Sequence, residues 1–187
     1  MTTALQTVAL GVISDPSPSQ FDEIFRLRLE AWRKQAKLKP GISRSADPWD
    51  EKSHHRALVA HEGTIAGAFR FSLHEDLANL PDGGVWVTEH HRVPGPHAYF
   101  SRMFMAPDFQ GMGLSETLDE LAISAPLGMG AATVTCLAGS VSASLQRLPQ
   151  MEKRGWRRVG VAPSHSPDAF WIADSMPAIL MITKAPT

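Results

Sequence analysis

The alternation of apolar and polar residues predicts a strand, a turn and a helix in the middle of the chain. The residues from Tyr99 to Met105 are bulky and largely apolar, which is typical of a buried strand. Pro107 and Asp108 end this strand, and two glycines follow at positions 111 and 113. Apolar residues then recur at helical spacing, at Leu114, Leu118, Leu121 and Ala122. We therefore predict that a strand, a glycine turn and a helix form the centre of the fold.

The flanking segments predict further strands and helices around this unit. We expect strands at residues 7–13, 57–60, 65–73, 131–137, 156–161 and 170–172, and another short element at 177–182. An amphipathic helix should begin with Ser19 as its N-cap and end at Pro40-Gly41. A second helix, interrupted or kinked near Pro149, should span residues 142–154. The stretch 74–97, with a short strand at 85–87, is interpreted as a long binding loop. No repeat or second core interrupts the pattern, so residues 1–187 are predicted to form a single domain of the α+β class.

Composition and charge narrow the class of function. The chain has 187 residues, so it can bury a substantial hydrophobic core. Its formal net charge is -1, so it has no strong positive electrostatic field that would attract nucleic acid or an anionic membrane. The single cysteine, Cys136, excludes an internal disulfide and a cysteine-based zinc site, and its apolar neighbours favour a buried structural thiol. Residues 1–14 do not resemble a secretion signal, and no apolar run is long enough to cross a membrane. We expect a cytoplasmic protein that acts on a small molecule, with no membrane or nucleic-acid partner and no metal, and we leave a homodimer open.

The glycine turn is the first candidate for chemistry. The start of a helix has backbone N–H groups without intrahelical partners and a partial positive charge, so it attracts phosphate. Glycines at 111 and 113 allow close approach of a ligand to the backbone, because they have no Cβ. The turn could hold a pyrophosphate without a lysine, although the bare pattern also fits a purely structural turn.

The residues around the glycines add a family resemblance. Gln110-x-x-Gly113-x-Ser115, after a hydrophobic strand and a proline, resembles the coenzyme A loop of the GCN5-related N-acetyltransferase (GNAT) superfamily. The resemblance implies a central mixed, mostly antiparallel sheet flanked by helices, with acetyl-CoA or another acyl-CoA as co-substrate. It also implies that the loop amides bind the pyrophosphate while the end of the strand lies along the pantetheine. The cofactor-binding residues expected on this basis are Met103, Phe104, Met105, Gln110, Gly111, Met112, Gly113, Leu114 and Ser115.

The front half of the chain resembles one branch of this superfamily, the acyl-homoserine-lactone synthases and related N-acyl amino acid synthases. The matching residues are Arg28 with Trp32, Asp47-Pro-Trp-Asp50, His54 or His55, Gly67-Ala-Phe-Arg70, Ser101-Arg102 and Met151 to Trp156. The resemblance implies that Trp32, Asp47, Asp50 and Arg70 lie at the substrate site.

The polar residues of this second match can also be judged by themselves. Arg70 and Arg102 lie within apolar strands, where an arginine needs an acidic partner, and Asp47 and Asp50 are available. A structural ion network and direct contact with substrate both stay open. Arg28 alone is interpreted as a solvated residue of the first helix.

The implied reaction is the direct attack of an amine on a thioester, which needs a deprotonated amine, hydrogen bonds to the oxyanion and a proton for the leaving thiolate. Two usual groups of the family are replaced: Tyr99 occupies the place of a glutamate on the main strand, and Met151 occupies the place of a tyrosine acid. The candidate catalytic residues are Tyr99, Ser101, Arg102 and Ser144. Other candidate bases, each more typical of a surface position, are His54, His55, His90, His91, His97 and Glu116.

Three functions are compatible with the sequence. The first is an acyl-CoA-dependent N-acyltransferase, an acetyltransferase in particular, that acts on the amine of a small molecule. The second is a lactone synthase or N-acyl amino acid synthase that uses a longer acyl thioester. The third is a module that binds acyl-CoA without turnover, which the replacements at Tyr99 and Met151 would allow.

Overall fold

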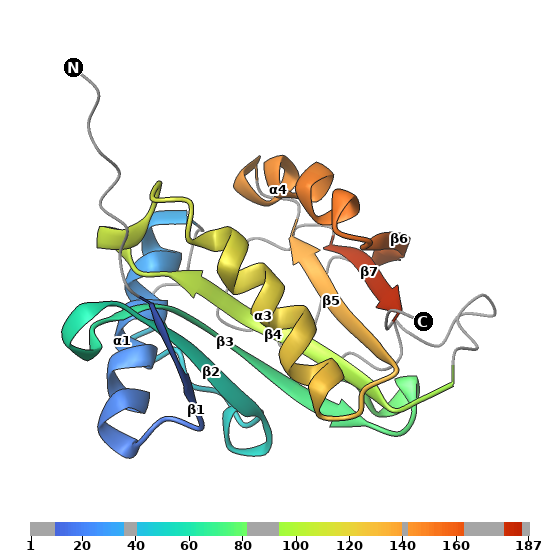
Figure 1. The fold of residues 1–187 in the computed structure, drawn as a ribbon, viewed down its shortest axis with the longest axis horizontal. Coiled ribbons are helices and arrows are strands. Elements are labelled where there is room, and N and C mark those ends of the chain that lie inside the picture. The colour runs from blue at the N-terminus through green and yellow to red at the C-terminus, as the bar shows by residue number, and fades with distance from the viewer. Residues whose placement is uncertain (1–9, 36–40, 82–93, 140–141, 163–177, 185–187) are drawn as a thin grey trace.

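A mixed sheet runs through the described part of the chain (Figure 1). The computed structural model describes residues 10–35, 41–81, 94–139, 142–162 and 178–184. Within these ranges the strands are β1 (Gly11–Ser14), β2 (His54–Val59), β3 (Ile65–His74), β4 (His97–Met105), β5 (Thr133–Gly139), β6 (Arg157–Ala162) and β7 (Ala178–Lys184). Their order in the sheet is β1-β2-β3-β4-β5-β7-β6, and every neighbouring pair is antiparallel except β4 and β5. The predicted mixed, mostly antiparallel sheet is confirmed.

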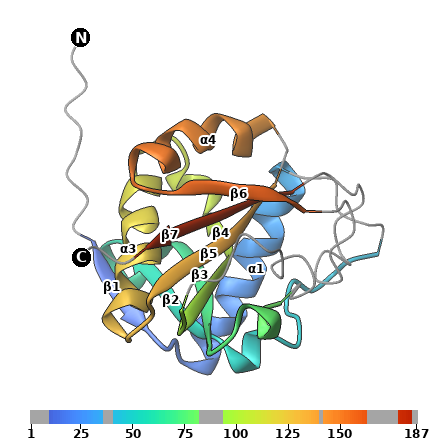
Figure 2. The ribbon, with the colours of Figure 1, turned by 90° about the vertical axis from the view of Figure 1, so that its right-hand side faces the viewer.

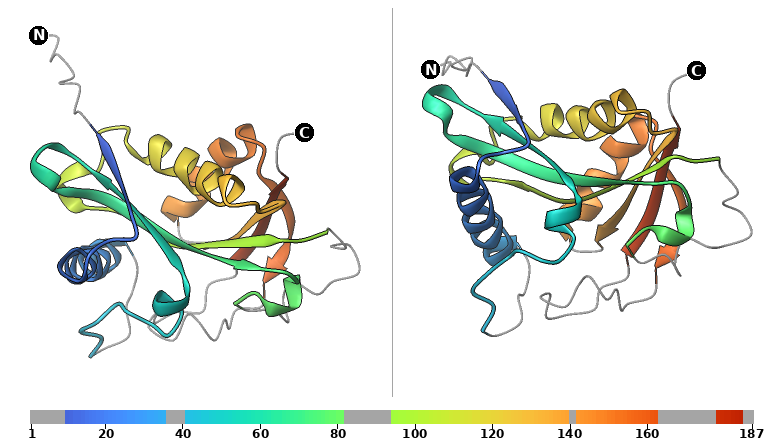
Figure 3. Two further views of the ribbon diagram at one scale, coloured as in Figure 1. Left: turned by 60° about the horizontal axis from the view of Figure 1, so that its bottom comes forward. Right: turned by 90° about the horizontal axis from the view of Figure 1, so that it is seen from below.

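Within the described residues, three α-helices cover the sheet from both sides (Figures 1 and 3). They are α1 (Pro18–Gln35), α3 (Ser115–Gly128) and α4 (Ser142–Lys153). The α1 helix begins two residues earlier than predicted: Pro18 is its first residue, and Ser17 rather than Ser19 precedes it. The main-chain N–H of Ser17 donates to the Gln20 side chain at 2.8 Å, which is one half of a capping box, and proline suits the first position of a helix.

The two faces of the sheet have separate hydrophobic cores. Phe69 and Phe71 of β3 pack under α3 and α4, with Leu118 and Trp156 in the same cluster. The alternate residues of β3 face α1, where Ala68 joins a second cluster. The α1 face of β3 continues as Arg70 and Ser72, both buried, so this side of the sheet changes from apolar to polar along the strand.

Strand β4 has two irregularities at its centre. Ala68 pairs with Phe104 whereas Arg70 pairs with Ser101, so Phe69 opposes two residues, and Arg102 in this bulge has a φ of 58°. The parallel pairing with β5 covers only His97–Phe100 against Thr133–Cys136, although both strands continue. Beyond this point β4 and β5 diverge (Figure 1).

The C-terminal part of the chain completes the sheet. Helix α4 continues through Pro149 instead of breaking there, and a turn at Gly155, with a φ of 90°, leads directly into β6, so α4 and β6 lie side by side (Figure 2). The predicted strands at 85–87 and 170–172 lie outside the described residues. Cys136 is buried, as predicted. Within the described ranges, no helix has the length and apolar character needed to span a membrane.

Candidate active site

The glycine loop between β4 and α3 is open to its surroundings. Gly111 and Gly113 have φ values of 80° and 78°, and a Cβ added at either position would meet no described atom within 4 Å. The loop is tied back to the strand, because the Gln110 side chain donates to the Met105 carbonyl at 3.2 Å. Helix α3 begins at Ser115, so the loop leads directly into the N-terminus of a helix. An anion can therefore reach the loop amides without displacing other described parts of the protein.

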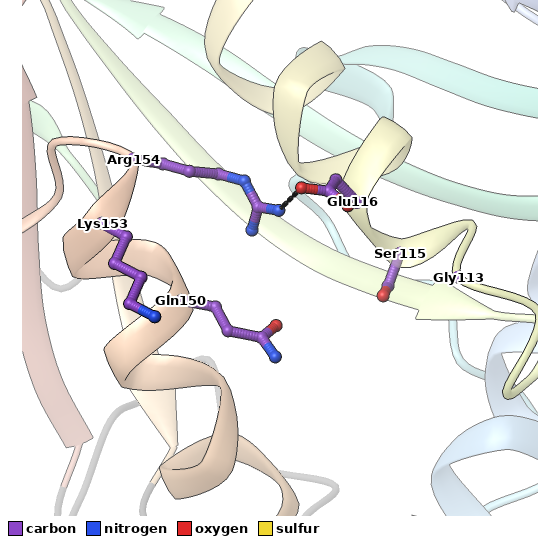
Figure 4. Close-up of a pocket in the computed structure, with 6 residues that line it drawn as sticks. All are labelled: Gly113, Ser115, Glu116, Gln150, Lys153 and Arg154. Atoms are coloured by element: carbon purple, nitrogen blue, oxygen red, sulfur yellow. Dashed lines mark hydrogen bonds and ion pairs between the residues drawn. The ribbon is translucent and has the colours of Figure 1, made fainter.

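A pocket of about 430 Å³ lies beside the loop (Figure 4). Gly113, Ser115 and Glu116 form its α3 side. The opposite side comes from the end of α4, whose contribution to the site was not predicted from sequence. The lining residues from that helix and the turn after it are Gln150, Lys153 and Arg154.

The strand that leads into the loop has a stretch of main chain that does not pair with β5. Once β5 diverges after Phe100, the edge of β4 from Ser101 to Met105 is no longer part of the pairing with β5. The Met103 and Met105 side chains pack partly buried against the α3 core, whereas Phe104 is buried on the α1 side. Phe104 can therefore meet a donor only through its main chain.

A cluster of buried charges lies under the same strand, on the α1 side. Arg70 Nη1 is 2.5 Å from Asp47 Oδ1 and 3.0 Å from Asp50 Oδ1. Arg102 approaches the other oxygen of Asp47, with Nη2 at 3.0 Å and Nε at 3.1 Å. Arg28 reaches Asp50 from α1 at 3.1 Å. The cluster thus connects α1, the 47–50 turn, β3 and the bulge of β4.

The interpretation of Arg28 as a solvated helix residue is wrong. Its side chain is 0% exposed and contacts Asp50, the Ser45 carbonyl at 3.4 Å and the Phe25 aromatic ring, whose centroid is 5.2 Å from the guanidinium carbon. Its position four residues after the buried Ile24 and three before the buried Ala31 was a signal of the buried face. His55, which is 1% exposed, closes the cluster with its Nε2 3.0 Å from the Asp50 carbonyl oxygen, so this nitrogen carries a proton and donates.

Burial and charge act in opposite directions on these groups. Burial lowers the pKa of Arg28 to about 10 against the attraction of Asp50. For Asp47, burial acts to raise the pKa, but the hydrogen bond from Arg70 and the charge of Arg102 outweigh it and lower the pKa below its ordinary value. Burial lowers the pKa of His55. Asp47 is therefore ionised and His55 neutral at pH 7.

The other predicted site residues fall into two groups. Ser101 belongs to the cluster, because Arg70 Nε donates to its hydroxyl at 3.2 Å. Tyr99, two residues before Ser101 on β4, is 5% exposed and pairs with Ser72 of β3. Trp32 packs partly buried on α1, and Ser144 lies in the first turn of α4, beyond β5. The structure therefore brings Asp47, Asp50, Arg70, Ser101 and Arg102 into one cluster, and places the loop residues at the far end of β4.

Two of the remaining candidate bases, His54 and His97, have separate partners in the described part of the chain. His54 is near Asp15, with its Nδ1 3.9 Å from the carboxylate, and His97 Nδ1 is 2.7 Å from the Thr133 hydroxyl. His90 and His91 lie outside the described residues. Among the residues that the structure describes, no three histidine, cysteine, aspartate or glutamate side chains gather as metal ligands.

The described fold is a mixed sheet that splits between β4 and β5, with a central strand that runs into an open glycine loop at a helix start. Residues 21–164 match the profile of the family described as the acetyltransferase (GNAT) family. The chain therefore belongs to the acetyltransferase (GNAT) family, and the expectation of an N-acyltransferase enzyme is confirmed at this level.

Solved structures show the same fold at low sequence identity. A GCN5-related N-acetyltransferase from Kribbella flavida has a TM-score of 0.61 at 15% identity, over 95% of this chain and 98% of that one. FeeM, an N-acyl amino acid synthase from uncultured soil microbes, has a TM-score of 0.65 at 12% identity, over 95% and 92%. An IAA acetyltransferase from Bacillus cereus has a TM-score of 0.60 at 13% identity, over 95% and 100%. No curated protein sequence is significantly similar to this chain.

Proposed function

We propose that this enzyme transfers an acyl group, acetyl in the first instance, from an acyl-CoA to the amine of a small molecule. The loop amides of Gly111 to Ser115 would bind the pyrophosphate, and the edge of β4 from Ser101 to Met105 would bind the pantetheine. The observation that carries the proposal is the open loop at the end of β4, at the point where β5 has left the strand. A thioester held by both would lie next to the bulge at Arg102.

The reaction balances without a metal or a covalent enzyme intermediate. The amine nitrogen forms a bond to the thioester carbon, the carbon–sulfur bond breaks, and the nitrogen loses a proton while the thiolate gains one. The bulge in β4 can direct a main-chain N–H toward the oxyanion. Tyr99, Ser101 and Ser144 are the hydroxyl groups that we assign to proton transfer or to the sulfur. Arg102 is assigned to the acceptor side, where its side chain is 10% exposed at the edge of the cluster.

A second candidate is N-acyl amino acid synthesis with a longer acyl donor. The observation in its favour is the cluster of Arg28, Asp47, Asp50, Arg70 and Arg102, whose residues are those of the synthase-like motif. The similarity to FeeM is consistent with this second candidate, but it shows the fold alone. The two candidates differ in acyl length and in the acceptor, which would carry a carboxylate in this second case.

The loop can be tested by thermal stabilisation. Saturating acetyl-CoA, at about 100 times its dissociation constant, should stabilise the fold by about 2.7 kcal/mol and raise Tm by about 5–10 °C. Gly113→Val should abolish this shift, because it puts a branched side chain between the ligand and the amides. Gly63→Val is the matched control: Gly63 has a φ of 77° and equally open surroundings, but it lies in the β2–β3 turn. It should carry the same backbone strain and keep the shift.

Function itself is tested by release of free CoA with acetyl-CoA, longer acyl-CoAs and a panel of amines and amino acids. Release with a simple amine and acetyl-CoA supports the first candidate, and release only with a long acyl donor and an amino acid supports the second. Stabilisation by no acyl-CoA, or a full shift in Gly113→Val, would overturn the proposed binding mode.

A further inference from the structure

The wall of the pocket opposite the glycine loop is basic. Lys153 and Arg154, at the end of α4, line the pocket together with Gly113, Ser115 and Glu116 (Figure 4). The Arg154 side chain extends across the pocket toward α3. These two cations therefore line the same pocket as the loop whose amides the proposed function assigns to pyrophosphate.

The described residues do not satisfy all the hydrogen-bond donors of Arg154. It forms an ion pair with Glu116 across the pocket, the interaction drawn in Figure 4. Its other terminal nitrogen, Nη1, lies 3.7 Å from Asp119 Oδ2, which is too far for a hydrogen bond, and it is buried with no hydrogen-bond partner in the described part of the chain. A guanidinium in this state gains from a further oxygen ligand.

Glu116, which pairs with Arg154, lies at a position where its negative charge would oppose the binding of a phosphate. It is the second residue of α3, so its carboxylate lies at the helix end that attracts anions. Its side chain is 66% exposed, whereas that of Arg154 is only 20% exposed. A diphosphate at the loop would repel this carboxylate and compete with it for Arg154. The carboxylate can therefore move into solvent more easily than the guanidinium, which is mostly buried.

We propose that Arg154 exchanges partners when the donor binds: it leaves Glu116 and pairs with a phosphate of the CoA nucleotide, and Lys153 adds to the attraction. Arg154 then selects donors that carry the phosphorylated nucleotide, and Glu116 weakens their binding. This inference rests on the proposed function, since it takes the same pocket as the CoA site.

The test is direct binding of two donors by calorimetry: acetyl-CoA, and acetyl-pantetheine, which has the thioester but no phosphate. Arg154→Ala should weaken acetyl-CoA about tenfold or more, the effect of a lost charge-assisted hydrogen bond. Glu116→Gln should strengthen acetyl-CoA about threefold, because it removes both the repulsion and the competing ion pair. Neither substitution should change the affinity for acetyl-pantetheine. Arg158→Ala is the matched control, since Arg158 pairs with Glu152 at 2.9 Å outside the pocket lining.

The outcomes separate this inference from the proposed function. If the wild type binds acetyl-CoA and Arg154→Ala binds it equally well, the exchange is wrong and the proposed function stands. An equal loss for acetyl-CoA and acetyl-pantetheine would also overturn the exchange, because it would mean a structural role. If the wild type binds no acyl-CoA, the proposed function fails. If Arg154→Ala does not fold, Glu116→Gln still tests the exchange, because this substitution is isosteric at an exposed position. Acetyl-CoA binding that is unchanged or weaker in Glu116→Gln overturns the exchange.

Discussion

The buried charge cluster should make Asp47 one of the most sensitive positions in the chain. Asp47→Asn keeps the shape of the side chain but removes a charge that faces two arginines. Arg70 is 1% exposed and would retain only Asp50 as an acidic partner among its described contacts. Arg102 would lose the carboxylate oxygen that it reaches with two nitrogens.

The expected cost follows from burial. Removing one partner of a buried ion pair typically costs about 3–5 kcal/mol, because the other charge stays out of water. For a chain of this size, each kcal/mol corresponds to about 2–4 °C, so we expect Tm to fall by about 6–20 °C. Combining Asp47→Asn with Arg70→Gln should cost less than the sum of the two single substitutions, since the second removes the charge left without its partner.

Urea unfolding followed by circular dichroism is the assay, with the slope of the transition checked for constancy. Glu23→Gln is the control: Glu23 pairs with Arg26 at 2.7 Å, but both side chains are largely exposed. Exposed pairs of this kind contribute at most about 1 kcal/mol. If Asp47→Asn is no more destabilising than Glu23→Gln, the cluster does not hold α1, the 47–50 turn and β4 together.

The remaining predictions concern pH and packing. Because the folded pKa of Asp47 is lowered, its stabilisation is present above pH about 4 and is lost as the pH falls below that value, so acid unfolding of Asp47→Asn should show a smaller stability change between pH 5 and 2. Burial lowers the pKa of His55, so its contribution is present above pH about 6.5 and declines below it; His55→Gln should lose this dependence when stability is compared at pH 7 and 5, and an unchanged profile would contradict the neutral buried imidazole. A Cβ on Gly67 would lie 2.7 Å from the Phe104 carbonyl oxygen, so Gly67→Ala should cost about 1–3 kcal/mol in urea unfolding, whereas Gly128→Ala, with no described atom within 4 Å, should be neutral.

Much of the fold could be predicted because it depends on local patterns. The strand, glycine loop and helix around Gly113 follow from periodicity and turn residues, and the hairpin of β2 and β3 follows from two apolar runs around a turn. The burial of Arg28 was missed because a single arginine on a helix does not show whether an acidic partner comes from a distant turn. Its partner, Asp50, is 22 residues away.

The α4 wall of the site was missed for a related reason. Glu116 and Arg154 are 38 residues apart and meet only because α3 and α4 pack on the same face of the sheet. Nothing in the local sequence of either helix specifies that approach. The order β5-β7-β6 was equally invisible, since the last strand of the chain inserts between two earlier ones.

The early separation of β4 from β5 has an evolutionary consequence. A donor that docks on main-chain amides and carbonyls is indifferent to which side chains the strand carries. In the proposed binding mode, a side chain such as that of Phe104, which is buried on the α1 side, could then change while the main-chain contacts to the thioester are kept. One backbone arrangement would in this way tolerate wide divergence, in keeping with fold neighbours that share as little as 10% of their residues with this chain.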